Sequence, residues 1–385
     1  MENLHLIVKM GWQKLHFLLY SARYNVFSGW AAVLVAGLFL LGWQTPATAQ
    51  SPSPTPLYPP NIPCAEFPLL LPAGVCSRAL PEKVSGIQLL ANNPDAIHLP
   101  YAHIYPDTKV YGSPENGILD IQVKRLLGNE HGRGLVYVTT EDYVEINGQG
   151  WYKINGGEWV AANRLTFVKP SHFAGIRFLT PPQDPVGWVV ATVRPSASAG
   201  GEPDPAAPLL RRYQVVKVLE KQLVGYWEWY RIGADLWVEQ RNMAVAWQEE
   251  KPAKDIKEDR WVSIDIYEQV LTAYEDDRMV FATLISSGLQ QFATQPGLYR
   301  IYAQVEFDNM SGAYTATKSD FYYIEDVPWT MYFDGDRAIH AAYWHDGFGF
   351  RKSHGCVNLS PSDAYWLYTW ASKGTWVWVH NPFPE

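Results

Sequence analysis

A short pattern that occurs twice is the strongest constraint on how this 385-residue chain can fold. Residues 151–160 read WYKINGGEWV and residues 229–238 read WYRIGADLWV, with the same internal spacing. In each copy, aromatic and branched residues flank a Gly-containing turn, which is typical of a β-hairpin. A pattern that recurs after 78 residues predicts two related small β domains. We expect their tryptophans to pack in the domain cores rather than to contact a ligand.

Length and charge narrow the class of protein. The chain is too long for one ordinary core, so several domains are expected. A hydrophobic content of 47% with 18% charged residues is typical of a folded chain. The net charge of −8 argues against a nucleic-acid partner, because phosphate binding usually needs a basic face.

Residues 1–49 have the layout of a signal peptide. Three basic residues precede an apolar run over residues 30–43, and a small-residue triplet ends at Ala49. The apolar run is shorter than the ~20 residues that a spanning helix prefers, which favours cleavage after Ala49 over an uncleaved anchor. We therefore expect an exported protein of the periplasm or cell envelope. It would meet a membrane only through this segment, if the segment is retained.

Residues 50–95 form a predicted linker that contains two of the three cysteines. The stretch 50–63 is rich in Pro and Ser and predicts an extended tether. Cys64 and Cys76 can form a disulfide outside the cytoplasm, although the sequence leaves that pairing open. Cys356 is then a lone thiol in an oxidising compartment, where it is exposed to oxidation and needs a reason to be present.

The run Ser353-His354-Gly355-Cys356-Val357-Asn358 supplies that reason. A cysteine acts as a nucleophile when a nearby base or cation favours its thiolate, and His354 shares a face with Cys356 in an extended segment. The amides of Gly355 and Cys356 could bind an oxyanion, and Asn358 could bind substrate. A second base candidate, His340, lies upstream, and the loop at residues 347–349 could fold it onto the thiol. His345 and His380 have no such context and are expected at the surface.

The C-terminal third reads as a β meander with one clear helix. Alternating strands are predicted at residues 261–266, 270–274 and 279–285, with a turn at residues 275–278. A helix should start at Ser360, with Pro361 in its first turn, and end at Gly374. A last strand is predicted at residues 376–380.

His340 together with the run from Ser353 to Asn358 resembles the signature of the L,D-transpeptidase catalytic domain, and the resemblance spans residues 258–382. Residues 326–333 and 359–370 match as well, whereas the His-to-Ser spacer is short for the family and the loop at residues 294–297 lacks the fuller form common there. The resemblance implies a β-sandwich-type domain that acts on peptidoglycan stem peptides. Cys356 would attack the carbonyl of the third-position diamino acid, D-alanine would leave with a proton from His340, and an amine would attack the thioester.

The same resemblance implies supporting roles for the neighbouring residues. His354 would support the site, with Ser353, Gly355, Asn358 and Tyr332 around the oxyanion and substrate. No metal or organic cofactor is implied, and carbapenem-type inhibitors should acylate Cys356.

The two hairpins are similar to the closing part of bacterial Src-homology-3-like domains, which often accompany cell-wall enzymes. This resemblance predicts one such β-barrel at residues 96–170 and a second at residues 171–248, which would position the enzyme on the wall. The predicted fold class is therefore mainly β: two small barrels followed by the catalytic domain.

Three alternatives remain open at this stage. His340, His354 and Cys356, with His345, could bind zinc. The chain could be a cell-wall peptide hydrolase (a carboxypeptidase), with water as acceptor, or a non-catalytic wall-binding protein. The acceptor, the cleavage of the signal and the oligomeric state are likewise not determined by the sequence.

Overall fold

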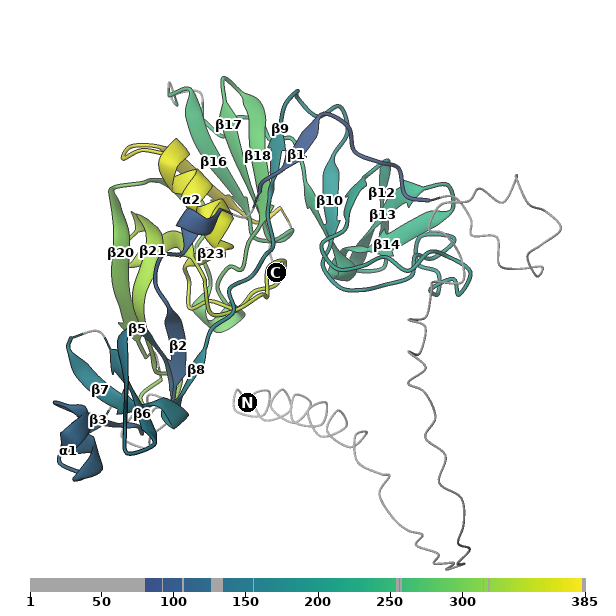
Figure 1. The fold of residues 1–385 in the computed structure, drawn as a ribbon. Helices are drawn as coiled ribbons and strands as arrows, with labels where there is room; N and C mark the ends of the chain where they lie inside the picture. The colour runs from purple at the N-terminus through teal and green to yellow at the C-terminus, as the bar shows by residue number, and fades with distance from the viewer. Residues whose placement is uncertain are drawn as a thin grey trace, which may run out of the picture. The chain divides into compact units, whose positions relative to one another are not determined.

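The computed structural model describes residues 80–382 except 92, 106, 126–133, 155, 254–255, 257, 314 and 318 (Figure 1). The predicted signal peptide, the tether, Cys64 and Cys76 lie outside the described residues. The described chain is mainly β, as the sequence predicts. Within it, no helix combines the length and the apolar character that a bilayer crossing requires.

One layer of the catalytic region is a seven-stranded sheet in the order β1-β9-β18-β17-β16-β24-β19. Its strands are β1 (Ile87–Leu89), β9 (Ile176–Phe178), β18 (Arg278–Leu284), β17 (Val270–Glu275), β16 (Arg260–Asp265), β24 (Trp376–His380) and β19 (Gly297–Arg300). Strands β16 to β18 form the predicted meander, and Asp276 and Asp277 take positive φ angles of 51° and 60° in the predicted turn. Strand β24 lies where predicted and runs parallel to β16.

The second layer contains strands β20 to β23. These are β20 (Ala303–Gly312), β21 (Tyr322–Asp334), β22 (Arg337–Ala341) and β23 (Val357–Leu359). Buried side chains of both layers meet in one core, among them Phe281 from β18 and Met331 from β21. Alternate residues of a strand face the same side. The opposite faces of β22 and β23 therefore point away from this core and can carry functional polar side chains.

Helix α2 (Pro361–Trp370) packs on the same core through Ala364 and Leu367. It starts as predicted, because the Ser360 side chain accepts a hydrogen bond from the Asp363 amide at 3.3 Å and Pro361 lies in the first turn. The predicted end at Gly374 is wrong. The helix ends at Trp370, with Ala371 as its extended C-cap, and Gly374 takes its φ of 97° in a later turn.

The first hairpin belongs to the same sheet as the catalytic strands. Strand β5 (Leu135–Ile146) pairs in parallel with β21 at one end and antiparallel with β6 at the other. The remaining elements around it are β2 (Tyr101–Ile104), β3 (Lys109–Tyr111), α1 (Pro114–Ile118), β4 (Gln122–Arg125), β6 (Gln149–Ile154), β7 (Glu158–Ala161) and β8 (Leu165–Phe167). Backbone hydrogen bonds therefore join the region of the first predicted barrel to the catalytic sheet, as Figure 1 shows for β5 beside β21.

The second hairpin lies in a pair of three-stranded sheets. One consists of β11 (Val215–Lys217), β10 (Val186–Val189) and β15 (Met243–Ala246), and the other of β12 (Glu220–Val224), β13 (Trp227–Gly233) and β14 (Leu236–Glu239). Both copies of the repeated pattern are hairpins, and each buries its Ile and its Val: Ile154 and Val160, then Ile232 and Val238. Trp151 is buried, whereas Trp229 is only half-buried. The assignment of these regions to Src-homology-3-like barrels, and the domain boundaries, stay predictions.

Candidate active site

A cavity of about 430 Å³ is lined by most of the site residues that the sequence predicts. His340, Ser353, His354, Cys356 and Asn358 all line it. Its other walls come from Trp344, from the β20–β21 hairpin and from Gly134 and Leu135 at the start of β5. Residues from outside the catalytic region thus complete the cavity around the thiol.

Two adjacent parallel strands bring the predicted nucleophile and base together. His340 on β22 is the register partner of Asn358 on β23, and Cys356 lies just before β23. Side chains two residues apart in an extended segment share a face, so Cys356 and Asn358 project to the side on which His340 lies. Sequence separation is large, but the parallel pairing makes the three residues neighbours.

His340 is held as a neutral base. Its ring nitrogen Nδ1 lies 3.1 Å from the carbonyl oxygen of Ala341, and a carbonyl can only accept, so Nδ1 carries the proton. The lone pair is therefore on Nε2. The side chain is 2% exposed, and this burial lowers the pKa of His340 to about 4. Near neutral pH the imidazole can take up a proton from a reacting group.

Cys356 is held as a thiol. Burial raises its pKa above the ordinary value of 9.0, and the amide of Ala338 and the charge of Arg337 offset only part of this effect. Its Sγ lies 3.9 Å from the carbonyl oxygen of Asp336, a weak contact. The neutral thiol and the neutral imidazole of His340 line the same cavity.

The turn that presents Cys356 depends on Ser353 and Gly355. The Ser353 hydroxyl donates to the carbonyl oxygen of Cys356 at 2.5 Å and accepts from the amide of Gly355 at 3.1 Å. Gly355 has a φ of 118°, which side chains rarely adopt, and an added Cβ would lie 3.0 Å from Arg337 Nε. Because the Gly355 amide is already bonded, the predicted pair of oxyanion donors is reduced in this conformation to the amide of Cys356.

The loop after β18 holds this turn in place through hydrogen bonds. Gly288 forms a bridge with Ser353, and the Leu289 amide donates to the Ser353 carbonyl at 2.9 Å. Thr294 Oγ1 accepts from the Gly288 amide at 3.0 Å and donates to the Gly355 carbonyl at 2.9 Å. The loop that departs from the family pattern in sequence thus still supports the nucleophile through buried hydrogen bonds.

His354 and Tyr332 are two further predicted site residues near Cys356. The His354 ring stacks on Phe292, with centroids 4.5 Å apart, and lines the cavity as a wall. Tyr332 does not line the cavity. Its hydroxyl donates to Asp308 at 2.7 Å, between β21 and β20, and burial raises the pKa of Tyr332 with a smaller contribution from Cys356. Its contact with substrate stays a prediction.

His345 contacts the cavity-lining Asn358, a role that the sequence did not suggest. The expectation that it lies at the surface is wrong: it is half-buried, and burial lowers its pKa to about 3. Its Nε2 lies 3.0 Å from the Asn358 side chain. No local pattern distinguishes this residue, because its burial depends on contacts with remote segments.

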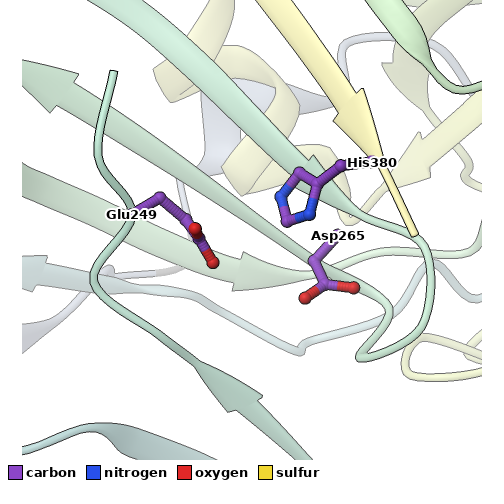
Figure 2. Close-up of side chains that lie close together, drawn as sticks. All are labelled: Glu249, Asp265 and His380. Carbon is purple, nitrogen blue, oxygen red and sulfur yellow. The ribbon is translucent and has the colours of Figure 1, made fainter. Parts of the chain in front are cut away.

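A second cluster of potential ligands lies at the end of the parallel pair β16–β24 (Figure 2). The ligand atoms of Glu249, Asp265 and His380 all lie within 4.8 Å of one another. His380 is half-buried and not at the surface as expected, and its Nε2 lies 2.8 Å from Ser263 Oγ. Asp265 Oδ1 accepts from the amides of Tyr267 and Glu268 at 2.8 and 3.0 Å.

These donor types suit a divalent metal, but hydrogen bonds to the surrounding fold already account for the positions of Asp265 and His380. Within the described part of the chain, no other group of three His, Cys, Asp or Glu side chains is placed to share an ion. In the described residues, His340, His354, His345 and Cys356 do not form such a group.

A thiol, a buried neutral imidazole and an amide donor around one cavity are the kinds of group that a cysteine acyl-transfer site uses. Residues 259–379 match the family model YkuD, described as the L,D-transpeptidase catalytic domain. This part of the chain is therefore an L,D-transpeptidase catalytic domain, as the sequence resemblance implies. No curated protein sequence matches the chain.

Solved structures of similar proteins include several L,D-transpeptidases. A mutant of the Enterococcus faecium enzyme is 27% identical over 35% of this chain and 55% of that chain, with a TM-score of 0.30. The Stackebrandtia nassauensis enzyme is 28% identical over 34% and 63%, with a TM-score of 0.26. The Mycobacterium smegmatis enzyme is 19% identical over 55% and 93%, with a TM-score of 0.30. The chain thus spans little more than half the length of the first solved structures that it matches.

Proposed function

We propose that this protein is a cysteine-dependent L,D-transpeptidase that acts on peptidoglycan stem peptides through a thioester. The observation that carries the proposal is the geometry of Cys356 and His340. Both line one cavity, His340 from β22 and Cys356 from just before the adjacent parallel strand β23, and the hydrogen bond of His340 to Ala341 leaves Nε2 free to accept a proton. The family model at residues 259–379 supplies the reaction class.

In the first half-reaction, Cys356 Sγ attacks the carbonyl carbon at the L-centre of the third stem residue. The thiol proton moves to His340 Nε2, and the carbonyl oxygen becomes an oxyanion that the Cys356 amide can bind. The C–N bond to D-alanine then breaks, and His340 returns its proton to the departing amine. A thioester on Cys356 and free D-alanine are the products.

In the second half-reaction, an acceptor amine attacks the thioester carbonyl and gives its proton to His340. The C–S bond breaks, and the thiolate takes the proton back from His340. The new amide is a cross-link between two stems or an exchanged terminal residue, depending on the acceptor. Water as acceptor would make the same site a carboxypeptidase.

The remaining parts of the proposal concern location and partners. We place the protein in the periplasm or cell envelope on the layout of residues 1–49, which lie outside the described structure. The regions of the two hairpins would position the enzyme on the wall. A carbapenem should acylate Cys356, because its strained lactam presents an electrophilic carbonyl to the same thiol.

The test is incubation of the full chain and its Cys356→Ala variant with a disaccharide-tetrapeptide, followed by mass spectrometry. Release of D-alanine with a dimer that depends on Cys356 supports transpeptidation. Release that depends on Cys356 without a dimer, even when amine acceptors are added, points to hydrolysis. Equal inactivity of both proteins, with no mass increase after carbapenem treatment, would reject the enzymatic proposal in favour of a wall-binding role.

A further inference from the structure

The ring of His345 connects a backbone turn to the Asn358 side chain. The amide of Gly347 donates to His345 Nδ1 at 3.0 Å, and Nε2 lies 3.0 Å from the terminal carboxamide of Asn358. Asn358 is 3% exposed and lines the cavity together with Cys356 and His340. Asn358 thus lies in space between His345 and the reacting groups.

The hydrogen bond from Gly347 determines where the His345 ring carries its proton. A nitrogen that accepts from a backbone N–H has no proton of its own, so the proton of the neutral ring is on Nε2. The lowered pKa of His345 keeps the ring neutral near pH 7. Nε2–H is therefore a donor, and the Asn358 atom opposite it must be an acceptor.

Only one orientation of the Asn358 carboxamide satisfies this requirement. The oxygen and nitrogen ends of a carboxamide have the same shape, and the hydrogen bonds around them decide which end is which. With Oδ1 opposite His345, the NH₂ group takes the other end. At that end the described residues offer no donor to a buried carboxamide oxygen, which also favours the NH₂ group there. A buried NH₂ group on a cavity-lining side chain can donate to a ligand.

We propose that His345 is a positioning residue that orients the Asn358 carboxamide, so that its NH₂ group donates to a carbonyl of the bound acyl donor. This inference rests on the proposed function for the identity of the ligand, but the orientation itself does not. The ligand chemistry is a peptide carbonyl next to the scissile bond. Asn358 would hold it in line with Cys356 Sγ and His340 Nε2.

Residues outside the catalytic domain hold the turn that carries His345. Asp346 follows His345 directly, and its carbonyl oxygen accepts from Arg212 and, at 2.9 Å, from the Tyr213 hydroxyl. The Asp346 carboxylate accepts from Ser171 and lies 3.4 Å from Arg212 Nη1. These contacts fix the backbone at residues 345–347, and through it the ring that faces Asn358.

The first measurement is the tautomer of His345 in the full chain. Long-range ¹H–¹⁵N correlation spectra of the ¹⁵N-labelled protein near pH 7, assigned by the signals lost in His345→Phe, should show a pyridine-type Nδ1 and a protonated Nε2. A protonated Nδ1 would overturn the proposal, since Asn358 would then face an acceptor. This readout needs no substrate, so a protein without turnover would reject the proposed function but leave the tautomer result valid.

The second measurement is a double-mutant cycle on disaccharide-tetrapeptide turnover. His345→Phe keeps the ring packing against Phe348 but removes both hydrogen bonds, and kcat/KM should fall about 10- to 100-fold. In an Asn358→Ala background the same change should cost less than about 2-fold, because its target is gone. An equal loss in both backgrounds would show that His345 does not act through Asn358. His380→Phe is the matched control and should leave kcat/KM unchanged, because that half-buried histidine does not line the cavity.

Discussion

His340 and Asn358 are register partners on the adjacent parallel strands β22 and β23. Their side chains project from the same face, and the cavity lies on that face. Each is fixed by a neighbour, because His340 bonds to the Ala341 carbonyl and Asn358 bonds to His345. Under the proposed function, a base and a donor with fixed orientations would therefore flank the site of attack before any substrate binds.

The pH dependence of catalysis should reflect the buried imidazole. Burial lowers the pKa of His340 from 6.5 to about 4, so the base form is lost only as the pH falls through about 4. We expect the acid limb of kcat/KM to lie well below pH 6, with activity kept at pH 5.5. A pH–rate profile on a stem-peptide substrate measures this. An acid limb at pH 6 to 7 would contradict the buried, neutral His340.

A substitution at Gly355 should damage both stability and activity. Ala at a φ of 118° is strained by about 1–3 kcal/mol, and its Cβ would press on Arg337 beside the thiol. Gly355→Ala should therefore lower the midpoint of urea unfolding and slow acylation of Cys356 by a carbapenem.

Gly374→Ala is the matched control for Gly355. Gly374 has a φ of 97° with open space around it, so Ala should cost stability there and leave the acylation rate unchanged. Normal acylation by the Gly355→Ala variant would mean that the turn geometry of residues 353–356 is not needed to present the thiol.

The sequence predicted those features that depend only on residues close together in the chain. The cap at Ser360, the turn at Asp276–Asp277 and the two hairpins follow from short local patterns, and all are present. Cys356 and His340 were found because their motif has a fixed order. The helix end was missed, because Gly374 signals a turn as readily as a helix C-cap.

Features that depend on distant segments had no signal in the sequence. The parallel pairing of Leu135 with Tyr322 joins residues far apart, and an extended apolar run does not specify its partner. The burial of His345 likewise depends on Arg212 and Tyr213, which hold the following residue in place. Sequence reasoning therefore singled out Cys356 and His340, which line one cavity, but not the residue that bonds to Asn358.

The catalytic segment should not fold well without the residues before it. A chain reduced to residues 258–382 loses β9 beside β18 and β5 beside β21, which leaves two unpaired sheet edges. It also exposes Ile324 and Tyr343, which pack against Tyr101 and Tyr137. We expect this fragment to aggregate or to bind a hydrophobic dye, whereas a chain that starts at residue 80 should be monodisperse. A monomeric fragment with cooperative unfolding would show that these contacts are dispensable.

Glu268 should make stability fall as the pH rises from about 4.5 to about 8. Its carboxyl group is buried where β13 and β15 meet the turn between β16 and β17, bonded to Tyr230 at 2.5 Å and to the Val245 amide at 3.0 Å. Burial, with a smaller effect from Asp265, raises its pKa from 4.5 to about 8. Between these values the folded state binds a proton that the unfolded state does not. The stabilisation is complete below pH 4.5 and is lost as the pH rises through about 8.

Glu268→Gln removes this titration and keeps the shape of the side chain. The free energy of unfolding of the wild type, relative to this variant, should fall by about 1.4 kcal/mol per pH unit between pH 5 and 8 and then level off. Urea unfolding of both proteins over that range measures the difference, and other titrating groups cancel in it. A constant difference between the two proteins would mean that Glu268 is ionised in the folded state and that its three hydrogen-bond donors outweigh the cost of burial.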